Sequence, residues 1–319
     1  MHSHNKIPLV AIVGPTAVGK TEIAVQLAER VNGEIVSADS RLLYRGMDIG
    51  TAKPSAAERA RVPHHLIDVA DPDEIWSLAV FQEAAQKAIA DIYSRRKLPI
   101  LVGGTGQYLR AILEGWAPPK LAAQPRLRTA LEDWAGEIGK DSLYARLARL
   151  DSVAAQSIDP RNLRRTIRAL EVIFSTGRKF SEVRSKTESP FRVLQIGLMR
   201  PRAELYQRID DRITSMLAVG WLEEVRTLMS KGYSPDLPSM SAIGYNQLIR
   251  HLSGQISLEE AVVEIKHATR MFVRRQANWF KKNDPQIHWF AASEIVLPEL
   301  INLVHGSLGI DYNLILRRG

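Results

Sequence analysis

The stretch "IPLVAIVGPTAVGKTEIAVQLAERV", residues 7–31, decides the fold. The apolar run 7–13 is typical of a buried strand, and the apolar residues that recur after Lys20 predict a helix over 19–31. Between them, Gly14 and Gly19-Lys20-Thr21 have the spacing of a phosphate-binding loop that joins a strand to a helix. The whole candidate loop is Gly14, Pro15, Thr16, Ala17, Val18, Gly19, Lys20 and Thr21.

The chemistry of such a loop favours an anion. Its backbone N–H groups and the positive end of the helix dipole point at the bound phosphate. Lys20 is expected to reach the terminal phosphates, and the Thr21 hydroxyl is expected to hold Mg²⁺. The motif by itself does not separate ATP from another diphosphate.

The composition bounds the class of protein. A chain of 319 residues, 45% of them hydrophobic, holds two domains or one large one with an ample core. No run of about 18 apolar residues is present, and the start "MHSHNK" lacks the hydrophobic region of a signal peptide. Because the chain has no cysteine, a disulfide framework and a thiolate metal site are excluded. We expect a cytoplasmic protein with no membrane partner.

The net charge of +8 is concentrated in two segments. Residues 161–186 carry eight Lys or Arg against two Glu, and residues 266–282 carry six basic residues and no acid. Each segment has a balance of +6, so the rest of the chain is at about −4. Such concentrated charge is expected of a surface that meets a polyanion, although two solvated helix faces would show the same pattern.

Apolar strands alternate with helical patterns along the chain. Strands are expected at 7–13, 34–38, 98–102 and 193–199, and helices at 19–31, 77–95, 201–217 and 258–282. This alternation predicts an α/β fold, a P-loop NTPase-like parallel sheet wrapped by helices, with ligands bound at the carboxyl ends of the strands.

The segment "GWAPPKLAAQP", residues 115–125, interrupts this alternation, and a helical stretch follows it. We therefore expect residues 118–192 to form a small helical insertion domain. A first core part, 1–117, precedes it, and a second core part, 193–319, follows with basic helices near its end.

Polar groups follow two of the expected strands. Asp39 comes directly after the second strand, where a carboxylate binds Mg²⁺ through water or accepts a proton, but capping the next turn is an equal alternative. The strand 98–102 runs into Gly103-Gly104-Thr105-Gly106, where an ATPase normally carries an acidic residue. Small residues permit close approach to the backbone, and Thr105 offers a hydroxyl. This turn argues against ordinary nucleotide hydrolysis.

Two basic helical segments are candidates for contact with nucleic acid. In 159–174, one face carries Arg161, Arg164, Arg165 and Arg168, and the opposite, buried face carries Leu163, Ile167, Leu170 and Phe174. In 269–282, the basic residues Arg270, Arg274 and Arg275 are interleaved with Phe272, Trp279 and Phe280. Guanidinium groups suit phosphates and aromatic rings stack on unpaired bases, whereas Trp279 and Phe280 are also expected to be partly core.

Three further basic residues, Arg208, Arg212 and Lys53, are candidates for contact with phosphate. Arg208 and Arg212 lie four residues apart, so one of them projects onto a diphosphate or pairs with Asp211 or Glu204. Lys53, in "DIGTAKP", is expected to be free to meet phosphate. The histidines lack the spacing of a metal site.

Taken together, seven segments resemble the tRNA dimethylallyltransferase family, also called tRNA isopentenyl transferases. They are, in order between residue 9 and about residue 290, "GPTAVGKT", "SADSRLLYRGMDIGTAKP", "VGGTGQYLRAIL", "NLRRTIRALEV", "RIDDRITSML", "SAIGYNQL" and "TRMFVRRQANWFKK". The resemblance implies transfer of a five-carbon prenyl group from dimethylallyl diphosphate to N6 of the adenosine on the 3′ side of the anticodon in certain tRNAs.

The resemblance also implies roles for residues. The loop Gly14 to Thr21 would bind the diphosphate, with Mg²⁺ on Thr21, and Asp39 would accept the proton from the adenine amine. Thr105 would lie at the reacting centre, and Arg212 would steady the departing diphosphate. The residues expected to contact the anticodon stem-loop are Asp39, Ser40, Arg41, Leu42, Thr105, Gln124, Arg164, Arg165, Arg168, Gly244, Tyr245, Arg274, Arg275, Gln276, Trp279 and Lys281.

The sequence departs from the family pattern at two positions. Leu42 stands where many members carry Gln, and Gln124 stands before Pro125 where an acidic residue is frequent. Two alternatives remain at this point: a P-loop kinase acting on a nucleoside or small metabolite, and a non-catalytic, NTP-gated RNA-binding protein. Because one chain carries every part of the expected site, a monomer is expected.

Overall fold

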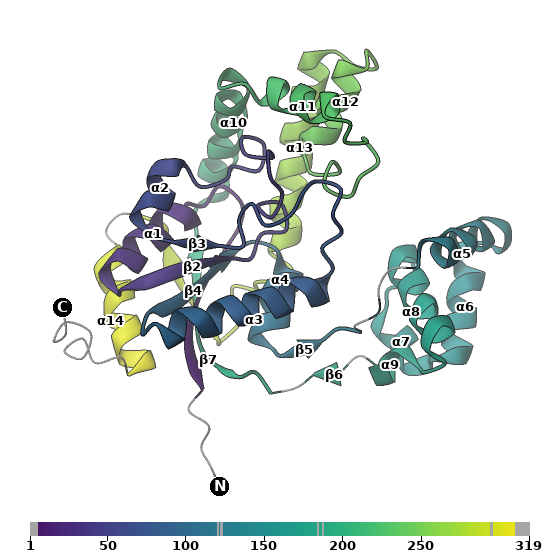
Figure 1. The fold of residues 1–319 in the computed structure, drawn as a ribbon, viewed down its shortest axis with the longest axis horizontal. Helices are drawn as coiled ribbons and strands as arrows, with labels where there is room; N and C mark the ends of the chain where they lie inside the picture. Colours follow the sequence, from purple (N-terminus) through teal and green to yellow (C-terminus); the bar gives the residue numbers. More distant parts are fainter. Residues whose placement is uncertain are drawn as a thin grey trace, which may run out of the picture. The chain divides into compact units, whose positions relative to one another are not determined.

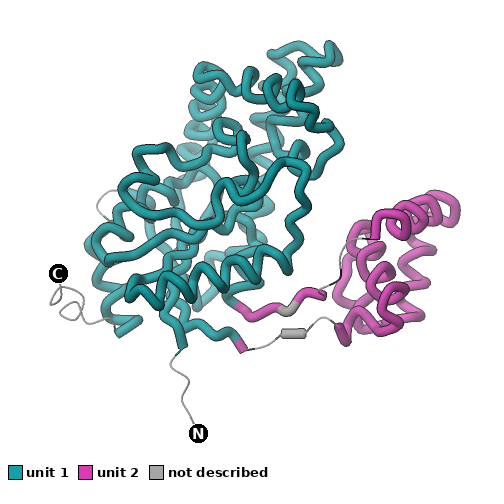
Figure 2. The backbone as a smooth tube through the Cα atoms, in the orientation of Figure 1, with its two compact units in different colours: residues 1–113, 189–319 teal, residues 114–188 magenta. Residues whose placement is uncertain are grey.

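A computed structural model describes residues 6–119, 121, 124–183, 185–186, 188–293 and 296–309. The N-terminal "MHSHN" and the end of the tail, 310–319, lie outside the described residues. The chain divides into two compact units, residues 1–113 with 189–319 and residues 114–188, coloured separately in Figure 2. No helix in the described ranges is long and apolar enough to cross a membrane.

The first unit is built on a six-stranded sheet whose order is β3-β2-β4-β1-β7-β8 (Figure 1). The strands are β1 (Ile7–Val13), β2 (Gly33–Ser37), β3 (His64–His65), β4 (Leu98–Gly103), β7 (Phe191–Met199) and β8 (Ile287–Ala291). All neighbouring pairs are parallel, which confirms the predicted α/β sheet. Sequence patterns missed β3, which has two residues, and β8, which is half exposed.

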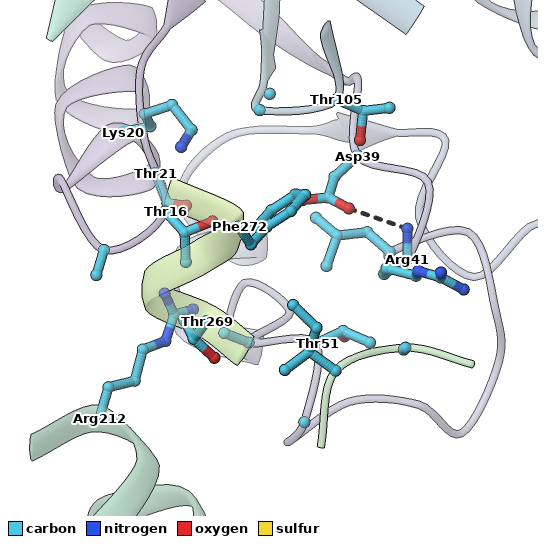
Figure 3. Close-up of a pocket in the computed structure, with 18 of the residues that line it drawn as sticks. Thr16, Lys20, Thr21, Asp39, Arg41, Thr51, Thr105, Arg212, Thr269 and Phe272 are labelled. Carbon is cyan, nitrogen blue, oxygen red and sulfur yellow. Dashed lines mark hydrogen bonds between the residues drawn. The ribbon is translucent and has the colours of Figure 1, made fainter. Parts of the chain in front are cut away.

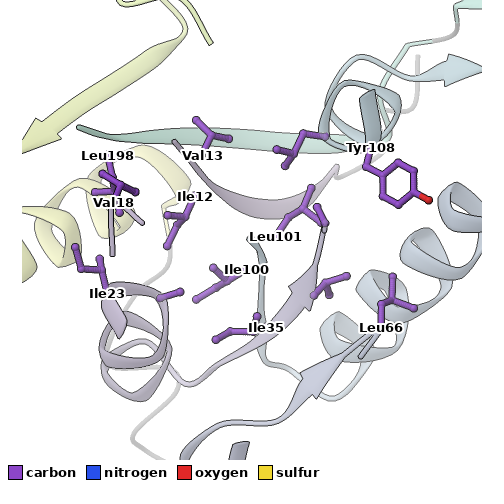
Figure 4. Close-up of a cluster of buried hydrophobic side chains, with 14 of the residues drawn as sticks. Ile12, Val13, Val18, Ile23, Ile35, Leu66, Ile100, Leu101, Tyr108 and Leu198 are labelled. Carbon is purple, nitrogen blue, oxygen red and sulfur yellow. The ribbon is translucent and has the colours of Figure 1, made fainter. Parts of the chain in front are cut away.

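The interior of the sheet explains why these segments become strands. The last five residues of β1 are completely buried, and β2 is buried throughout, so neither shows polar alternation. Figure 4 shows Ile12 and Ile100 in the core together with Val18 and Ile23 from the segment after β1. Because all the strands run in the same direction, the ends of β1, β2 and β4 meet at one edge, where the segments after them come together.

Helices surround this sheet in the first unit. They are α1 (Lys20–Arg30), α2 (Ala56–Arg61), α3 (Leu78–Ser94), α4 (Gly106–Leu113), α10 (Arg202–Ala218), α11 (Trp221–Ser230), α12 (Tyr245–Leu252), α13 (Leu258–Gln276) and α14 (Leu297–Leu308). The helix expected over 258–282 starts as predicted, where Ser257 and Glu260 form a capping box. It ends six residues early, because the chain turns after Gln276 and the Asn278 N–H bonds to the Arg275 carbonyl.

The second unit is a separate helical body. It contains α5 (Pro125–Ile138), α6 (Lys140–Leu150), α7 (Ser152–Ser157), α8 (Leu163–Thr176) and α9 (Phe180–Val183), and the antiparallel pair β5 (Trp116–Ala117) and β6 (Ser185–Lys186). Leu143, Leu147 and Leu170 form the centre of its own core. The limits expected from the sequence, 118 and 192, each lie four residues later in the chain than the limits of the unit, 114 and 188. Phe174, expected to be buried, is 49% exposed because it lies near the end of α8.

Candidate active site

A cavity of about 1010 Å³ opens at the carboxyl ends of β1, β2 and β4, within the first unit. Its lining comes from the phosphate loop, the segments after β2 and β4, and the helices α10 and α13. Figure 3 shows Lys20, Thr21, Asp39, Thr105 and Arg212 around it. The cavity lining includes Asp39, Thr105, Arg212 and, from the loop, Thr16, Ala17, Gly19, Lys20 and Thr21, whereas Gly14, Pro15 and Val18 of the expected diphosphate-binding set do not line it.

The phosphate loop adopts its shape through two glycines. Gly14 has φ +150°, and a Cβ there would lie 2.7 Å from the Leu198 carbonyl oxygen. Gly19 has φ +106° at the start of α1, a conformation that side chains disfavour. Val18 is completely buried, and its N–H donates to the Pro15 carbonyl oxygen at 3.4 Å, so this residue stabilises the turn of the loop and does not line the cavity. The loop can thus present N–H groups to an anion at the amino end of α1.

Lys20 lies inside this loop. Its Nζ donates hydrogen bonds to the carbonyl oxygens of Gly14, at 3.0 Å, and Pro15, at 2.9 Å. Burial lowers the pKa of Lys20 to about 8, against the opposing effect of Asp39, while Arg212 adds a further lowering. The amine therefore remains mainly protonated at neutral pH and becomes more strongly so beside a phosphate.

Asp39 both caps the following turn and lines the cavity. Its Oδ1 accepts a hydrogen bond from the Arg41 N–H at 2.9 Å, the dashed line in Figure 3. Its Oδ2 has no hydrogen-bond partner within the described ranges. The Ser40 N–H donates to Thr105 Oγ1 at 3.3 Å, so the segments after β2 and β4 are tied together. The two interpretations of Asp39 are compatible, since the cap uses one oxygen and leaves the other for a proton.

Gly103 allows the backbone segments after β2 and β4 to lie this close together. A Cβ on Gly103 would lie 2.3 Å from the Ala38 carbonyl oxygen, so only glycine lets the backbone before Asp39 reach the end of β4. The Gly-Gly-Thr turn thus has a packing reason in addition to any role toward a ligand.

The two arginines of α10 differ in their contacts. Arg208 Nε donates to the Ala17 carbonyl oxygen at 2.9 Å and ties α10 to the phosphate loop. Arg212 lines the cavity and has no hydrogen bond to another described residue. Burial lowers the pKa of Arg212, although Asp39 acts in the opposite direction. Neither arginine pairs with the acids that the alternative named, because Glu204 accepts from Arg200 and Asp211 accepts from Gln207.

Gln276 lies in the interior and not at an exposed surface. The residue is 3% exposed, with Oε1 accepting from the Thr16 N–H at 2.9 Å and Nε2 donating to the Gly104 carbonyl oxygen at 3.1 Å. Sequence reasoning placed this residue on the tRNA. The structure gives it bonds to protein backbone on both sides, and nothing in the sequence pattern distinguishes the two roles.

Trp279 and Phe280 follow in the same segment. Phe280 is buried, and a Cβ on Gly106 would lie 2.2 Å from Trp279 Cγ, so the indole packs against the backbone of α4. Arg110 lies 5.4 Å from the centroid of the Trp279 ring, and the ring also lines the cavity. The expectation that both aromatic residues are partly core is confirmed.

Other residues expected on the tRNA divide by exposure. Arg164, Arg165, Arg274, Arg275 and Lys281 are exposed, and Ser40, Arg41 and Leu42 are half-buried. The Arg41 guanidinium donates to the Pro238 carbonyl oxygen at 2.8 Å and reaches Ser241 Oγ, so it connects the segment after β2 to the segment before α12.

Some of these expectations need correction. Tyr245 is completely buried, and a Cβ on Gly244 would lie 2.0 Å from the Trp221 ring, so neither is exposed to an RNA. Lys53 is not free, because its ammonium bonds to Asp48 and Asp68, and its side chain is 2% exposed. For Lys53, carboxylates from elsewhere in the chain pair with a cation that the sequence presented as available.

In the second unit, two residues expected to contact tRNA, Gln124 and Arg168, form hydrogen bonds to Glu171. Its carboxylate is completely buried and accepts from Arg168 at 2.6 Å, from Arg128 at 2.9 Å and from the Gln124 backbone N–H at 2.7 Å. Arg168 thereby neutralises a buried charge, which distinguishes it from the exposed Arg164 and Arg165 on the same helix.

The basic segment 266–282 is also partly neutralised. Arg270 pairs with Asp210 at 2.6 Å, and Lys266 lies 3.9 Å from the same carboxylate. Arg274 donates to the Tyr206 hydroxyl at 3.3 Å. The charge excess is therefore concentrated at the carboxyl end of α13 and beyond.

The chain is similar to known proteins over most of its length. The family described as IPP transferase matches residues 42–283, and that described as isopentenyl transferase matches residues 7–68. A curated tRNA dimethylallyltransferase from a Roseiflexus species is 56% identical over 276 residues, which cover 86% of this chain and 90% of that protein. The curated tRNA dimethylallyltransferase from Thermomicrobium roseum is 50% identical over 90% of this chain and 87% of its own.

Solved structures show the same relationship. The tRNA isopentenylpyrophosphate transferase from Bacillus halodurans is 41% identical with a TM-score of 0.72, covering 97% of this chain and 99% of that one. A eukaryotic dimethylallyltransferase acting on tRNA is 29% identical with a TM-score of 0.78. The match covers 98% of this chain and 80% of that one.

Proposed function

The chain belongs to the tRNA dimethylallyltransferase family, and we propose that its cavity transfers the dimethylallyl group of dimethylallyl diphosphate to N6 of the adenosine on the 3′ side of the anticodon. The chain is an enzyme, a tRNA prenyltransferase, and its substrates are a tRNA and the prenyl diphosphate. Membership in this family sets aside the kinase and the NTP-gated binding protein.

One observation carries the assignment of the site: a proton acceptor, Asp39, and two cations, Lys20 and Arg212, line a single cavity. A prenyl transfer needs both kinds of group. The cations hold the diphosphate and stabilise its charge as it leaves, and the carboxylate takes the proton that the new bond releases.

The adenine N6 forms a bond to C1 of the prenyl group while the bond from C1 to the diphosphate oxygen breaks, and the electron pair leaves with the diphosphate. The proton lost from N6 passes to Asp39 Oδ2. The Arg41 N–H bond to Oδ1 holds the carboxylate in place, and Asp39 lines the cavity. Thr105, tied to Ser40, orients the segment that carries Asp39.

Mg²⁺ is consistent with the side chains present. Thr21 and Asp39 offer oxygen atoms to the cavity, and oxygen is the ligand that Mg²⁺ prefers. In the described part of the chain no cluster of three or more His, Cys, Asp or Glu side chains has metal-site geometry, so Thr21 would hold the ion together with diphosphate oxygens. Such an ion supplies positive charge to the leaving group.

The tRNA would contact exposed cations of both units. Arg164 and Arg165 in the second unit, and Arg274, Arg275 and Lys281 in the first, have their side chains at the surface. The target base must leave its stack at a cost of a few kcal/mol, and these contacts would offset that cost. The monomeric state and the cytoplasmic location stay predictions from the sequence.

The test is the identity of the product. Unmodified tRNA is incubated with the protein, radiolabelled dimethylallyl diphosphate and Mg²⁺, without ATP, and is then digested to nucleosides. We expect the label on an N6-prenylated adenosine. A labelled product other than adenosine, or turnover only with ATP, would contradict the proposal.

A further inference from the structure

One wall of the cavity is a short loop, and a carboxylate on a nearby helix accepts hydrogen bonds from its backbone. The loop is residues 47–54, "MDIGTAKP", and its last five residues line the cavity. Figure 3 shows Thr51 on the opposite side of the cavity from Lys20. This loop therefore bounds the cavity on the side away from Lys20.

The carboxylate is that of Glu224 on α11. Its Oε2 accepts from the N–H groups of Asp48, at 2.7 Å, and Ile49, at 2.6 Å, and its Oε1 accepts from the Gly50 N–H at 3.1 Å. The Tyr245 hydroxyl donates to the same Oε1 at 2.6 Å. Four donors thus converge on one carboxylate, and three of them are consecutive backbone groups of the loop.

The same helix contacts the loop a second time. A Cβ on Gly50 would lie 2.0 Å from Trp221 Nε1, so the loop backbone packs directly on the indole. Ala52 has φ +53°, a left-handed conformation that costs a residue with a side chain roughly 1–2 kcal/mol. Its N–H bonds to the Ile49 carbonyl oxygen at 2.9 Å. Such a conformation persists only where surrounding contacts determine it.

The face that the loop turns toward the cavity carries no exposed charge. Lys53 directs its ammonium to Asp48, Asp68 and the Tyr44 carbonyl oxygen. Gly50, Thr51, Ala52 and Pro54 complete the wall. A neutral wall of small side chains suits a hydrocarbon better than a diphosphate or an RNA backbone. Arg212 lies beside the outer part of this loop, where it lines a second pocket with Ala52, Lys53 and Pro54.

From this arrangement we propose that Glu224 is a positioning residue for the transfer reaction. It fixes the wall formed by residues 50–54 and thereby limits the length of the prenyl chain that the cavity accepts. The inference rests on the proposed function, because it assumes a prenyl diphosphate whose charged end lies at Lys20. It adds a determinant of donor choice that lies outside the phosphate loop and makes no contact with the reacting atoms.

The variant Glu224→Gln tests the proposal. A glutamine places an NH₂ group where the carboxylate accepts N–H donors, so it pushes the loop away while keeping the size of the side chain. Initial rates are measured with dimethylallyl diphosphate and with the ten-carbon geranyl diphosphate. We expect KM for the short donor to rise about tenfold with kcat within about twofold, and the preference in kcat/KM for the short donor to fall about tenfold. The matched control is Glu223→Gln, an exposed neighbour on the same helix.

Tyr245→Phe provides a second, milder variant. It removes one of the four hydrogen bonds and keeps the buried ring, so we expect the donor preference to shift in the same direction by about two- to fivefold. A tRNA binding measurement and a melting curve accompany each variant, and Tyr245→Phe decides if Glu224→Gln does not fold. Equal losses for both donors, or an unchanged preference, would overturn the proposal. Failure of the wild-type protein to transfer either prenyl group would instead contradict the proposed function.

Discussion

Gln276 Oε1 accepts a hydrogen bond from the Thr16 N–H, so the last residue of the basic helix α13 touches the phosphate loop directly. The other end of the same amide bonds to Gly104 at the end of β4. One buried side chain therefore connects the helix that bears Arg274 and Arg275 to two of the segments that line the cavity.

Replacing this residue should weaken donor binding. Gln276→Ala removes both bonds and leaves the buried Gly104 carbonyl oxygen without a partner, which costs about 1–3 kcal/mol. It also releases the Thr16 N–H at the edge of the cavity. We expect the Kd of dimethylallyl diphosphate, measured by calorimetry, to rise about tenfold, because the loop loses its fixed shape. Gln255→Ala, at an exposed position, is the control. An unchanged Kd would show that the loop keeps its shape without Gln276.

Exposed arginines should bind tRNA through its phosphates. Arg165→Ala and Arg274→Ala each remove one cation, so we expect weaker binding and a slope of log K against log salt that is smaller by about one. Filter binding at several salt concentrations measures both quantities. Arg149→Ala removes the same charge from another helix of the second unit and serves as the comparison. Equal slopes for all the variants and the wild type would show that these arginines lie on solvated helix faces and do not contact the RNA.

Arg168 should behave differently from its neighbour Arg165. Because it pairs with the completely buried Glu171, Arg168→Ala leaves that carboxylate with one guanidinium fewer. We expect a loss of about 1–3 kcal/mol in the free energy of unfolding, visible as a lower melting temperature. Arg165→Ala should leave the melting temperature unchanged within error. If Arg168→Ala weakens only tRNA binding, Arg168 acts on the RNA and not on the fold.

Glu34 should make the first unit sensitive to acid. The Arg95 hydrogen bonds, followed by those of Lys97 and His65, hold the pKa of this buried carboxyl well below its ordinary value of 4.5, against the effect of burial. A lowered folded-state pKa stabilises the fold above the unfolded-state pKa, and this stabilisation is lost as the pH falls below it. We expect Glu34→Gln to cost about 2–4 kcal/mol at pH 7 and progressively less below pH 4.5.

Denaturant unfolding at several pH values checks this expectation. Glu29→Gln breaks an ion pair with Arg61 that is more than a third exposed, so it should cost less than about 1 kcal/mol. A constant difference between Glu34→Gln and the wild type from pH 7 to pH 3 would contradict the linkage.

The features that sequence predicts well are those that local backbone chemistry fixes. The loop from Gly14 to Thr21 is such a feature, because its glycines and its position between strand and helix determine its shape. The place of Asp39 at the same sheet edge follows from the parallel order of the strands. Helix starts with a clear cap, such as Ser257 before α13, were also predictable.

The features that sequence missed depend on partners far along the chain. Tyr245 looks like an available polar aromatic residue until the structure places Glu224 against its hydroxyl. Lys53 looks like a free cation until Asp68 reaches it, and Gln276 looks like part of a basic surface until Thr16 and Gly104 surround it. Neither periodicity nor a motif predicts which residue, far away in the sequence, forms a hydrogen bond or ion pair with a buried polar atom.

The central claim is that Asp39 accepts the proton while the cations of the cavity hold the donor. Single-turnover transfer by Asp39→Asn, with saturating tRNA and dimethylallyl diphosphate, tests it most directly. The amide keeps the size of the side chain and an oxygen for the Arg41 N–H, but it accepts a proton poorly. We predict that the transfer rate falls about 10²–10⁴-fold while the Kd values of tRNA and donor change less than about threefold. A rate near that of the wild type would contradict the claim.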